Sequence, residues 1–326
     1  MKLRSFVGFS LPSVALMLLL LALPMVMTAW LSVRNCAFDM QLATVTQTGP
    51  FGASEVTTQR ARLDENGRPV EVCNFVGGEY YRKVLGLDSQ AGGGPGNDQN
   101  EFFGALRFTM LFVAATTPFV LIGGLVLALA MNRVTQRLKG LFIAASLLPF
   151  IITPVVGALS IKWLFRDNGL VPHLLSGVGV ELFWMGQAWS AQLLVILYGI
   201  WHTLPFAFIV FYAGLQGVPQ DSLESATLDG ANAWQRLRYV TLPHLMPLVV
   251  FVTLIHLMDS YRVFEPVIVL TQGAFTTSVQ VLTYHVLLLE DNPYKASAAA
   301  VLTIVGIGIL LIPLLRKTWR EQRKGF

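Results

Sequence analysis

Residues 216–243 read QGVPQDSLESATLDGANAWQRLRYVTLP, a polar stretch between two long apolar runs. Pro219 is expected to end the helix before it, because proline supplies no backbone N–H. Asp221 and Glu224 have the three-residue spacing of a capping box, which predicts a short helix from about Ser222. A short polar helix between two apolar runs is an unusual connection for a membrane protein.

Small side chains follow the start of this expected helix. Ser225, Ala226, Gly230 and Ala231 would let the backbone of another protein approach closely. Gly230 also permits the positive φ with which many helices end. The stretch therefore has the chemistry of a surface that a partner protein holds.

The composition of the whole chain places it in a membrane. Of its 326 residues, 54% are hydrophobic and 13% are charged, and the mean hydropathy is +0.60. A membrane-spanning helix needs about 20 apolar residues, and helices are the spanning form that pairs its own backbone groups. We expect an all-α polytopic membrane protein whose six spanning helices cover about residues 6–33, 102–131, 141–165, 188–215, 242–270 and 296–315.

The first apolar run has two readings. Lys2 and Arg4 precede it, as in a secretory signal peptide. The run continues through Trp30, however, and Arg34-Asn35-Cys36 is a poor cleavage site. A retained first helix is the favoured reading, so residues 1–33 are expected to form the N-terminus and first helix.

Basic residues predict the orientation of the chain, because Lys and Arg near helix ends stay on the cytoplasmic side. Both termini are then cytoplasmic, and residues 317–326 form a basic cytoplasmic tail. The pI near 9 needs no nucleic-acid partner. An inner-membrane topology and anionic lipid both favour an excess of positive charge. The basic residues on the inner side would be Lys2, Arg4, Arg133, Arg137, Lys139, Arg236, Arg238, Arg316, Lys317, Arg320, Arg323 and Lys324.

One connection, residues 34–101, is long and polar and is expected to lie in the periplasm. Its run 91–98, rich in Gly and Pro, predicts a flexible linker, and Asn66-Gly67 before Val70-Glu71-Val72 suggests a small hairpin. Cys36 and Cys73 both lie here, and either a disulfide or two free thiols fits the sequence. The spacing offers no metal site.

The spacing of the polar stretch resembles a known motif. Glu224-Ser225-Ala226, three residues, Gly230, nine residues, Val240, one residue and Leu242-Pro243 match the conserved cytoplasmic loop of ATP-binding-cassette (ABC) importer permeases. Ser225 stands where the family usually has a second alanine, and Val240 where it usually has isoleucine. The resemblance implies that residues 216–241 form a coupling loop, in which Glu224, Ser225, Ala226, Asp229, Gly230, Val240, Leu242 and Pro243 contact a separate ATPase.

The resemblance extends over about residues 100–316, so residues 102–316 are expected to form a permease core of the type I importer fold. This part of the chain is similar to the carbohydrate branch of the family, which includes importers of maltose, lactose and glycerol-3-phosphate. The supporting stretches are Leu148-Pro149 with Pro154, Trp163-Leu164-Phe165, Asn168-Gly169-Leu170, Val263-Phe264-Glu265, Leu270-Thr271-Gln272-Gly273 and Ala296 to Ala300.

This resemblance implies an assembly and no chemistry within the chain. The partners would be a second related permease, two copies of an ABC ATPase, a periplasmic solute-binding protein and a sugar or polyol-type substrate. The chain has no Gly-x-x-x-x-Gly-Lys-Ser/Thr loop, so ATP and Mg²⁺ are expected on the ATPase and no cofactor on this chain.

Ionisable residues within the apolar runs are candidates for the substrate pathway. Such side chains are expensive in lipid and usually face the bundle interior or a wet cavity. Asp259 and Arg262 are three apart, as are Arg262 and Glu265, so each pair is expected on one helical face. The candidates are Tyr198, His202, His256, Asp259, Tyr261, Arg262 and Glu265.

Each candidate also has a structural reading. The charged set on the fifth run can neutralise itself and fix helix packing, and Tyr198 and His202 can make interhelical hydrogen bonds. An ion-coupled secondary transporter of a small polar solute is the alternative function, but it gives no reason for the coupling loop. An intramembrane enzyme is disfavoured because the chain has no His-Glu-x-x-His or Gly-x-Ser-x-Gly motif. The identity of the solute does not follow from the sequence.

Overall fold

The structure is a computed structural model that describes residues 3–49, 52–64, 67–87, 101–177, 179 and 183–324. The chain divides into two compact units. Unit 1 comprises Met1–Gln99 with Val286–Leu302, and unit 2 comprises Asn100–His285 with Thr303–Phe326. The predicted linker at residues 91–98 lies outside the described residues.

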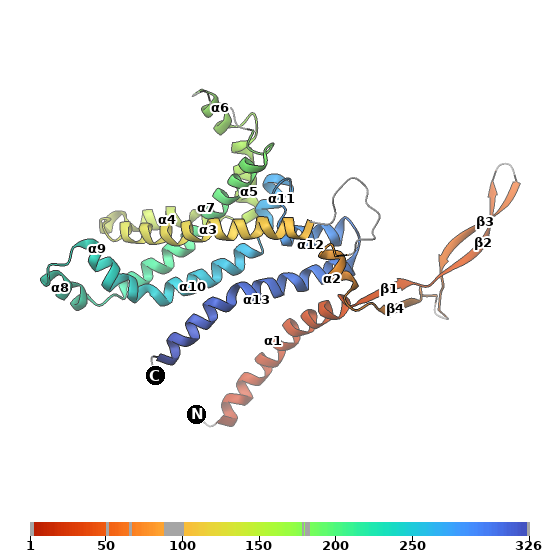
Figure 1. Ribbon diagram of the computed structural model, residues 1–326, viewed down its shortest axis with the longest axis horizontal. Helices are drawn as coiled ribbons and strands as arrows, with labels where there is room; N and C mark the ends of the chain where they lie inside the picture. The colour runs from red at the N-terminus through yellow and green to blue at the C-terminus, as the bar shows by residue number, and fades with distance from the viewer. Residues whose placement is uncertain are drawn as a thin grey trace. The chain divides into compact units, whose positions relative to one another are not determined.

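Unit 2 is helical (Figure 1). Its long helices α3, α7 and α10 run beside one another, and the last helix, α13, begins in unit 1 and ends in unit 2. The elements of unit 2 are α3 (Glu101–Met131), α4 (Gln136–Ile151), α5 (Pro154–Phe165), α6 (Leu170–Ser176), α7 (Ala188–Gln216), α8 (Gln220–Leu228), α9 (Ala233–Arg236), a π-helical turn (Leu237–Thr241), α10 (Leu242–Tyr261), α11 (Glu265–Thr271), most of α12 (Val279–Leu288) and the later part of α13 (Pro293–Lys324).

A close approach of α3 and α7 forms the centre of unit 2. Phe208 and Phe211 are buried there among residues of α3 and α10. A Cβ atom on Gly124 would lie 2.7 Å from Cβ of Ala207 and 3.0 Å from the backbone of α7. Glycine at this position therefore sets the distance between the two helices, since no other residue leaves that space.

Hydroxyl groups inside these helices bond to their own backbone. Thr109 donates to the carbonyl of Ala105 at 2.8 Å, and Thr116 donates to that of Phe112 at the same distance. Thr203 does the same within α7. These bonds pair three hydroxyl groups that would be costly to leave unpaired in an apolar environment.

Six spans are obtained if a bent pair is counted as one. Within the described part of the chain, five helices are long and apolar enough to cross a membrane, and α4 together with the stretch from Pro154 to Ser176 forms a sixth candidate that bends by 94°. The expectation of one continuous span over 141–165 is therefore wrong. Ile152 and Thr153 are extended, and Pro154 then opens α5, because proline fits the first helical turn but cannot continue α4.

The fifth expected span, 242–270, is also interrupted. Helix α10 ends at Tyr261, and α11 starts at Glu265 with Pro266 in its first turn. Pro266 supplies no N–H for a bond to Arg262, so a continuous helix would leave that carbonyl unpaired. The placement of Arg262 and Glu265 on one helical face was consequently wrong, because the helix ends between them.

Unit 1 contains α1 (Leu3–Leu31), the strands β1 (Arg34–Phe38) and β4 (Glu71–Phe75), helix α2 (Glu79–Val84) and the start of α13. The two strands are antiparallel and pair Cys36 with Cys73, which form a disulfide. Tyr294 of α13 donates a hydrogen bond to the carbonyl of Cys36 at 2.9 Å and stacks on Tyr80 of α2. The disulfide-linked ladder thus joins the first helix to the last.

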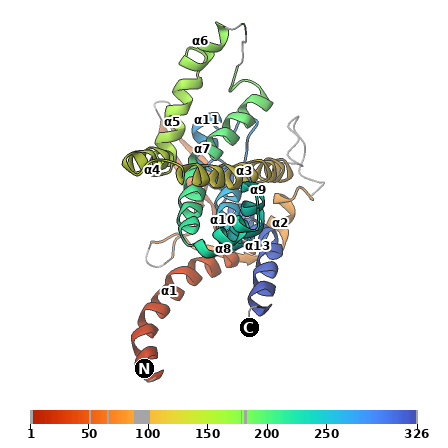
Figure 2. The ribbon, with the colours of Figure 1, turned by 90° about the vertical axis from the view of Figure 1, so that its left-hand side faces the viewer.

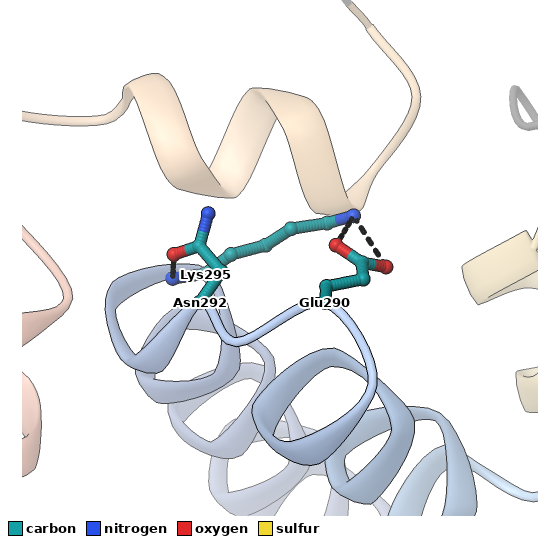
Figure 3. A network of polar contacts seen from close by, with 3 residues as sticks. All are labelled: Glu290, Asn292 and Lys295. Atoms are coloured by element: carbon teal, nitrogen blue, oxygen red, sulfur yellow. Dashed lines mark hydrogen bonds and ion pairs between the residues drawn. The ribbon is translucent and has the colours of Figure 1, made fainter. Parts of the chain in front are cut away.

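The turn before α13 is fixed by polar contacts (Figure 3). Asn292 accepts a bond from the backbone N–H of Lys295 at 2.9 Å, as a helix N-cap does. The ammonium of Lys295 lies 2.7 Å and 3.1 Å from the two carboxylate oxygens of Glu290. These contacts set the direction in which α13 starts.

The expected small hairpin is present in part, since the N–H of Val70 bonds to the carbonyl of Arg62 at 2.8 Å. The largest hairpin pairs β2 (Met40–Gly49) with β3 (Gly52–Ala61). At the expected place, Leu63 bridges Pro69 across a turn closed by Gly67, while Asn66 lies outside the described residues. Residues 71 and 72 instead pair with β1, because the disulfide partner lies on that strand.

We expect Gly124→Leu to destabilise unit 2 by about 1–3 kcal/mol, the usual cost of overpacking a tight contact. The backbone of α7 cannot move away as a flexible side chain could. Thermal unfolding in detergent measures the effect. Gly104→Leu is the matched control on the same helix, because a Cβ on Gly104 meets nothing within 4 Å. Equal midpoints for the two variants would contradict this account of helix contact.

Candidate functional site

The polar connection between α7 and α10 folds into two short helices at one end of unit 2, the end that Figure 2 views. Helix α8 begins at Gln220, with Pro219 at the N-cap position and no side-chain cap. The expected capping box of Asp221 and Glu224 is therefore absent from α8. Pro219 already occupies the cap, which leaves Asp221 in the first turn, where its charge favours the helix dipole.

Helix α8 ends in a tight turn at Gly230. The N–H of Ala231 bonds to the carbonyl of Ala226 at 2.9 Å, and the N–H of Gly230 bonds to that of Thr227 at 3.1 Å. This is the Schellman pattern, and it requires the positive φ of 78° at Gly230. Ala226 and Gly230 of the sequence motif thus form the two ends of one helix-terminating turn.

The next helix is fixed to α8 by side chains. Asn232 and Gln235 form a reciprocal capping box at the start of α9. Arg236 of α9 donates to the hydroxyl of Thr227 on α8 at 2.8 Å. The α8–α9 corner is therefore a rigid unit at the tip of unit 2.

The motif residues fall into two groups. Glu224, Ser225 and Asp229 are exposed on α8 and its end, where a partner can reach them. Val240, Leu242 and Pro243 belong to the helical run that enters α10, so the expected loop 216–241 is largely helical. Pro243 stands in the first turn of α10, the position where its missing N–H costs least.

The candidates Tyr198 and His202 lie on α7 beside the break between α4 and α5. The hydroxyl of Tyr198 donates to the carbonyl of Pro154 at 2.8 Å. Nδ1 of His202 lies 2.7 Å from the carbonyl of Pro149, and because a carbonyl only accepts, this nitrogen carries the proton. The rings of Tyr198 and His202 stack at 5.7 Å. Tyr198 and His202 therefore hydrogen-bond to backbone carbonyls on the two sides of the break between α4 and α5.

His256 is buried between α10 and α3. Its Nε2 lies 3.1 Å from the hydroxyl of Thr116 and 3.1 Å from that of Ser260. Tyr261 is also buried and packs against Gly306 of α13. Both candidates thus contact neighbouring helices, and neither is exposed at the surface of this chain.

The charged candidates are different, because they are exposed. Arg262 and Asp259 form an ion pair at 3.5 Å, and 58% and 62% of their side chains are accessible. Glu265 is exposed at the start of α11. The structure therefore brings the expected Asp259–Arg262 pair together at the end of α10.

Sequence reasoning missed a polar contact that holds α11 in place. The ammonium of Lys162 on α5 donates to the carbonyl of Val269 at 2.7 Å. This carbonyl is in the last turn of α11, where backbone acceptors have no partner in the helix. A lysine near the end of an apolar run was the available signal, but its acceptor is remote in sequence.

Residues 100–323 match the family model described as binding-protein-dependent transport system inner membrane component. The chain belongs to this family of ABC importer permeases. It is a membrane transport subunit and not an enzyme, and the family assignment does not favour a secondary transporter.

Similar proteins agree with this assignment. The chain is 32% identical over 238 residues to the trehalose/maltose transport system permease protein MalF of Thermococcus litoralis, covering 71% of this chain and 75% of that protein. It is 33% identical to the trehalose transport system permease protein SugA of Mycobacterium tuberculosis, covering 63% and 66%. A solved bacterial alginate ABC transporter, in complex with an alginate pentasaccharide-bound periplasmic protein, shares the permease fold with a TM-score of 0.65 at 24% identity, covering 75% and 83%.

We expect Tyr198→Phe to destabilise the permease by about 0.5–1.5 kcal/mol, because it removes the hydrogen bond from α7 to the carbonyl of Pro154 at the α4–α5 break. Thermal unfolding in detergent measures the loss. Tyr212→Phe on the same helix is the control, since the contacts of Tyr212 are ring contacts. A loss no larger than that of the control would mean that the break does not depend on this bond.

Proposed function

We propose that this permease forms one half of the pathway of a solute importer and is driven by ATP hydrolysis on a separate subunit. The observation that carries the proposal is the exposed, rigid α8–α9 corner. Two hydrogen bonds at Gly230, a capping box and the Arg236–Thr227 bond fix its shape. A corner that does not deform can transmit movement of an ATPase to the attached helices α7 and α10.

The proposed solute is a sugar or a sugar-like polyol. The relatives named for trehalose, maltose and lactose transport support this class. A soluble periplasmic binding protein would deliver the solute, as the family description and the alginate complex suggest. The ATPase would bind ATP and Mg²⁺.

The proposed assembly contains a second related permease and two ATPase copies in a bacterial inner membrane. Both termini of this chain would be cytoplasmic, as the distribution of Lys and Arg favours. The α8–α9 corner then lies on the cytoplasmic side, where an ATPase is available.

The exposed ion pair of Asp259 and Arg262 supports a pathway along the end of α10. Charged side chains do not face lipid without a large cost, so an exposed pair must face water or another protein. Glu265 and the extended backbone at Ile152 and Thr153 also require polar surroundings. We place the solute pathway beside these groups, with the second permease forming the opposite wall.

Coupling can be tested in the purified assembly. Gently solubilised permease should retain the second permease and the ATPase, and the binding protein with its solute should stimulate ATP hydrolysis. We expect Glu224→Lys, at an exposed site, and Gly230→Pro, which removes the N–H bonded to Thr227, to reduce this stimulation at least about tenfold, the change that a loss of about 1.4 kcal/mol in docking produces.

The control for this experiment is Glu71→Lys, an equivalent charge reversal on an exposed residue of β4. This variant should insert normally, and ATP hydrolysis in its assembly should be stimulated as in the assembly of the unaltered permease. Normal stimulation in both α8-corner variants would refute the coupling role. A permease that purifies without an ATPase would refute the assembly itself.

The pathway role of the ion pair predicts a specific defect. Arg262→Gln should raise the KM for uptake while the assembly remains intact, because a donor to the solute is lost. Uptake kinetics and the yield of the assembly are measured together. Arg137→Gln, near the start of α4 and outside the apolar run, is the control. Loss of the second permease from the Arg262→Gln assembly, with KM unchanged, would show that the pair serves packing instead.

A further inference from the structure

The loop between α11 and α12 holds two residues with side chains in a left-handed backbone conformation. Gln272 has a φ of 54° and Phe275 has a φ of 60°, and they are two of the three non-glycine residues with positive φ in the described part of the chain. This conformation is unfavourable for a residue with a Cβ atom, and a bulky side chain rarely adopts it. Glycine would adopt it without strain. Strained residues of this kind gather at functional sites.

Hydrogen bonds fix the loop in this conformation. The side-chain amide of Gln192 on α7 donates to the carbonyl of Phe275 at 3.0 Å. The carbonyl of Gly273 accepts bonds from the hydroxyl of Thr277 at 2.9 Å and from the N–H of Thr276 at 3.3 Å. The loop is therefore rigid, and its strained residues hold their side chains in defined positions.

Packing within the chain does not account for the side chain of Phe275. Its ring is 55% exposed, so burial offsets little of the backbone strain. Gln272 is exposed as well, and an exposed amide does not suit contact with lipid chains. The two side chains thus offer an aromatic ring and an amide to a ligand that is partly polar.

The loop lies at the end of unit 2 opposite the α8–α9 corner (Figure 1). Helix α10 leads from that corner to Tyr261, and its 20 residues span about 30 Å, which matches the hydrocarbon thickness of a bilayer. Helix α11 then runs from Glu265 to Thr271, where the loop begins. With the corner in the cytoplasm, the loop is on the periplasmic side. It lies about 10 Å along α11 from Glu265 of the proposed pathway.

Helix α12 connects the proposed pathway to this loop. Tyr284 is 39% exposed, and its ring packs edge-on against Phe264, the residue before Glu265, with the ring centres 5.1 Å apart. The next residue, His285, lies close to Gly273 of the loop. Aromatic side chains therefore continue from the start of α11 to the loop.

We infer that Phe275 and Gln272 form an outer binding site for a sugar ring at the periplasmic entrance of the pathway. This inference rests on the proposed function. One face of a sugar ring carries C–H groups, which pack on the electron-rich face of an aromatic ring. The amide of Gln272 offers two N–H donors and a carbonyl acceptor to the sugar hydroxyl groups. Because the loop is rigid, little conformational freedom is lost when the solute binds.

Phe275→Gly tests the site, because glycine adopts the same φ without strain. The solutes are a radiolabelled panel of hexoses, disaccharides, oligosaccharides and polyols, given to the complete transporter with its binding protein. We expect kcat/KM for uptake to fall about tenfold, which corresponds to about 1.4 kcal/mol of lost binding. The thermal midpoint of the variant should equal or exceed that of the unaltered assembly. Phe275→Tyr keeps the ring and should retain uptake, and Phe103→Ala, which removes an exposed ring from α3, should not affect it.

A photoreactive probe identifies what the ring contacts. When p-benzoylphenylalanine replaces Phe275, we expect an adduct between the permease and a labelled sugar, and none when it replaces Phe103. Adducts with the binding protein or the second permease alone would overturn the sugar site and leave the proposed function intact.

The uptake measurements can also contradict the inference. Equal uptake by Phe275→Gly and the unaltered permease would overturn the site, and lost uptake together with a lower thermal midpoint would show that the ring serves packing instead. An unaltered assembly that imports no member of the panel would overturn the proposed solute class, and the site with it.

Discussion

Every backbone N–H and C=O inside a hydrocarbon layer needs a partner within the protein, and this requirement organises unit 2. Long helices meet it along most of the chain. The break between α4 and α5 does not, because prolines and two extended residues interrupt the pattern of helix bonds. Tyr198 and His202 supply donors to two carbonyls beside it. The break is therefore an integral part of the fold, held by a neighbouring helix.

The same constraint explains the α8–α9 corner at the aqueous end. Two helices that end and begin within a few residues leave several backbone groups unpaired. The turn at Gly230 and the capping box of Asn232 and Gln235 pair these groups locally. Because these backbone groups are paired within the corner, its outer face needs no contact from the rest of the permease. That face remains available to a partner.

The sequence predicted the spanning helices well where hydrophobicity alone determines them, as for α3 and α7. It failed at the two interruptions, because averaged hydropathy does not register the end of a helix. Pro149 and Pro154 were visible, but the donors at His202 and Tyr198 lie about fifty residues away. The capping box expected at Asp221 was wrong because Pro219 already takes the cap position, and the real box starts at Asn232.

The motif spacing predicted a local turn more reliably than the ionisable residues predicted their own surroundings. Spacing between Ala226 and Gly230 reflects a local turn, which a sequence encodes completely. Whether an ionisable side chain points into the bundle depends on remote neighbours, so His256 and Asp259, on the same helix, have opposite environments: His256 is buried and Asp259 is exposed.

The exposed ion pair also limits the kind of solute that suits the proposed pathway. Asp259 and Arg262 neutralise each other, so together they offer no net charge with which to trap an ion. The guanidinium of Arg262 has five N–H donors and the carboxylate of Asp259 has two acceptor oxygens. The ion pair uses only some of these donors and acceptors. Both side chains keep more than half of their surface accessible, so the remaining donors and acceptors are free to meet polar groups. An array of donors and acceptors without net charge matches hydroxyl groups, which both donate and accept. In the proposed pathway, this pair therefore suits the hydroxyl groups of a sugar or a polyol.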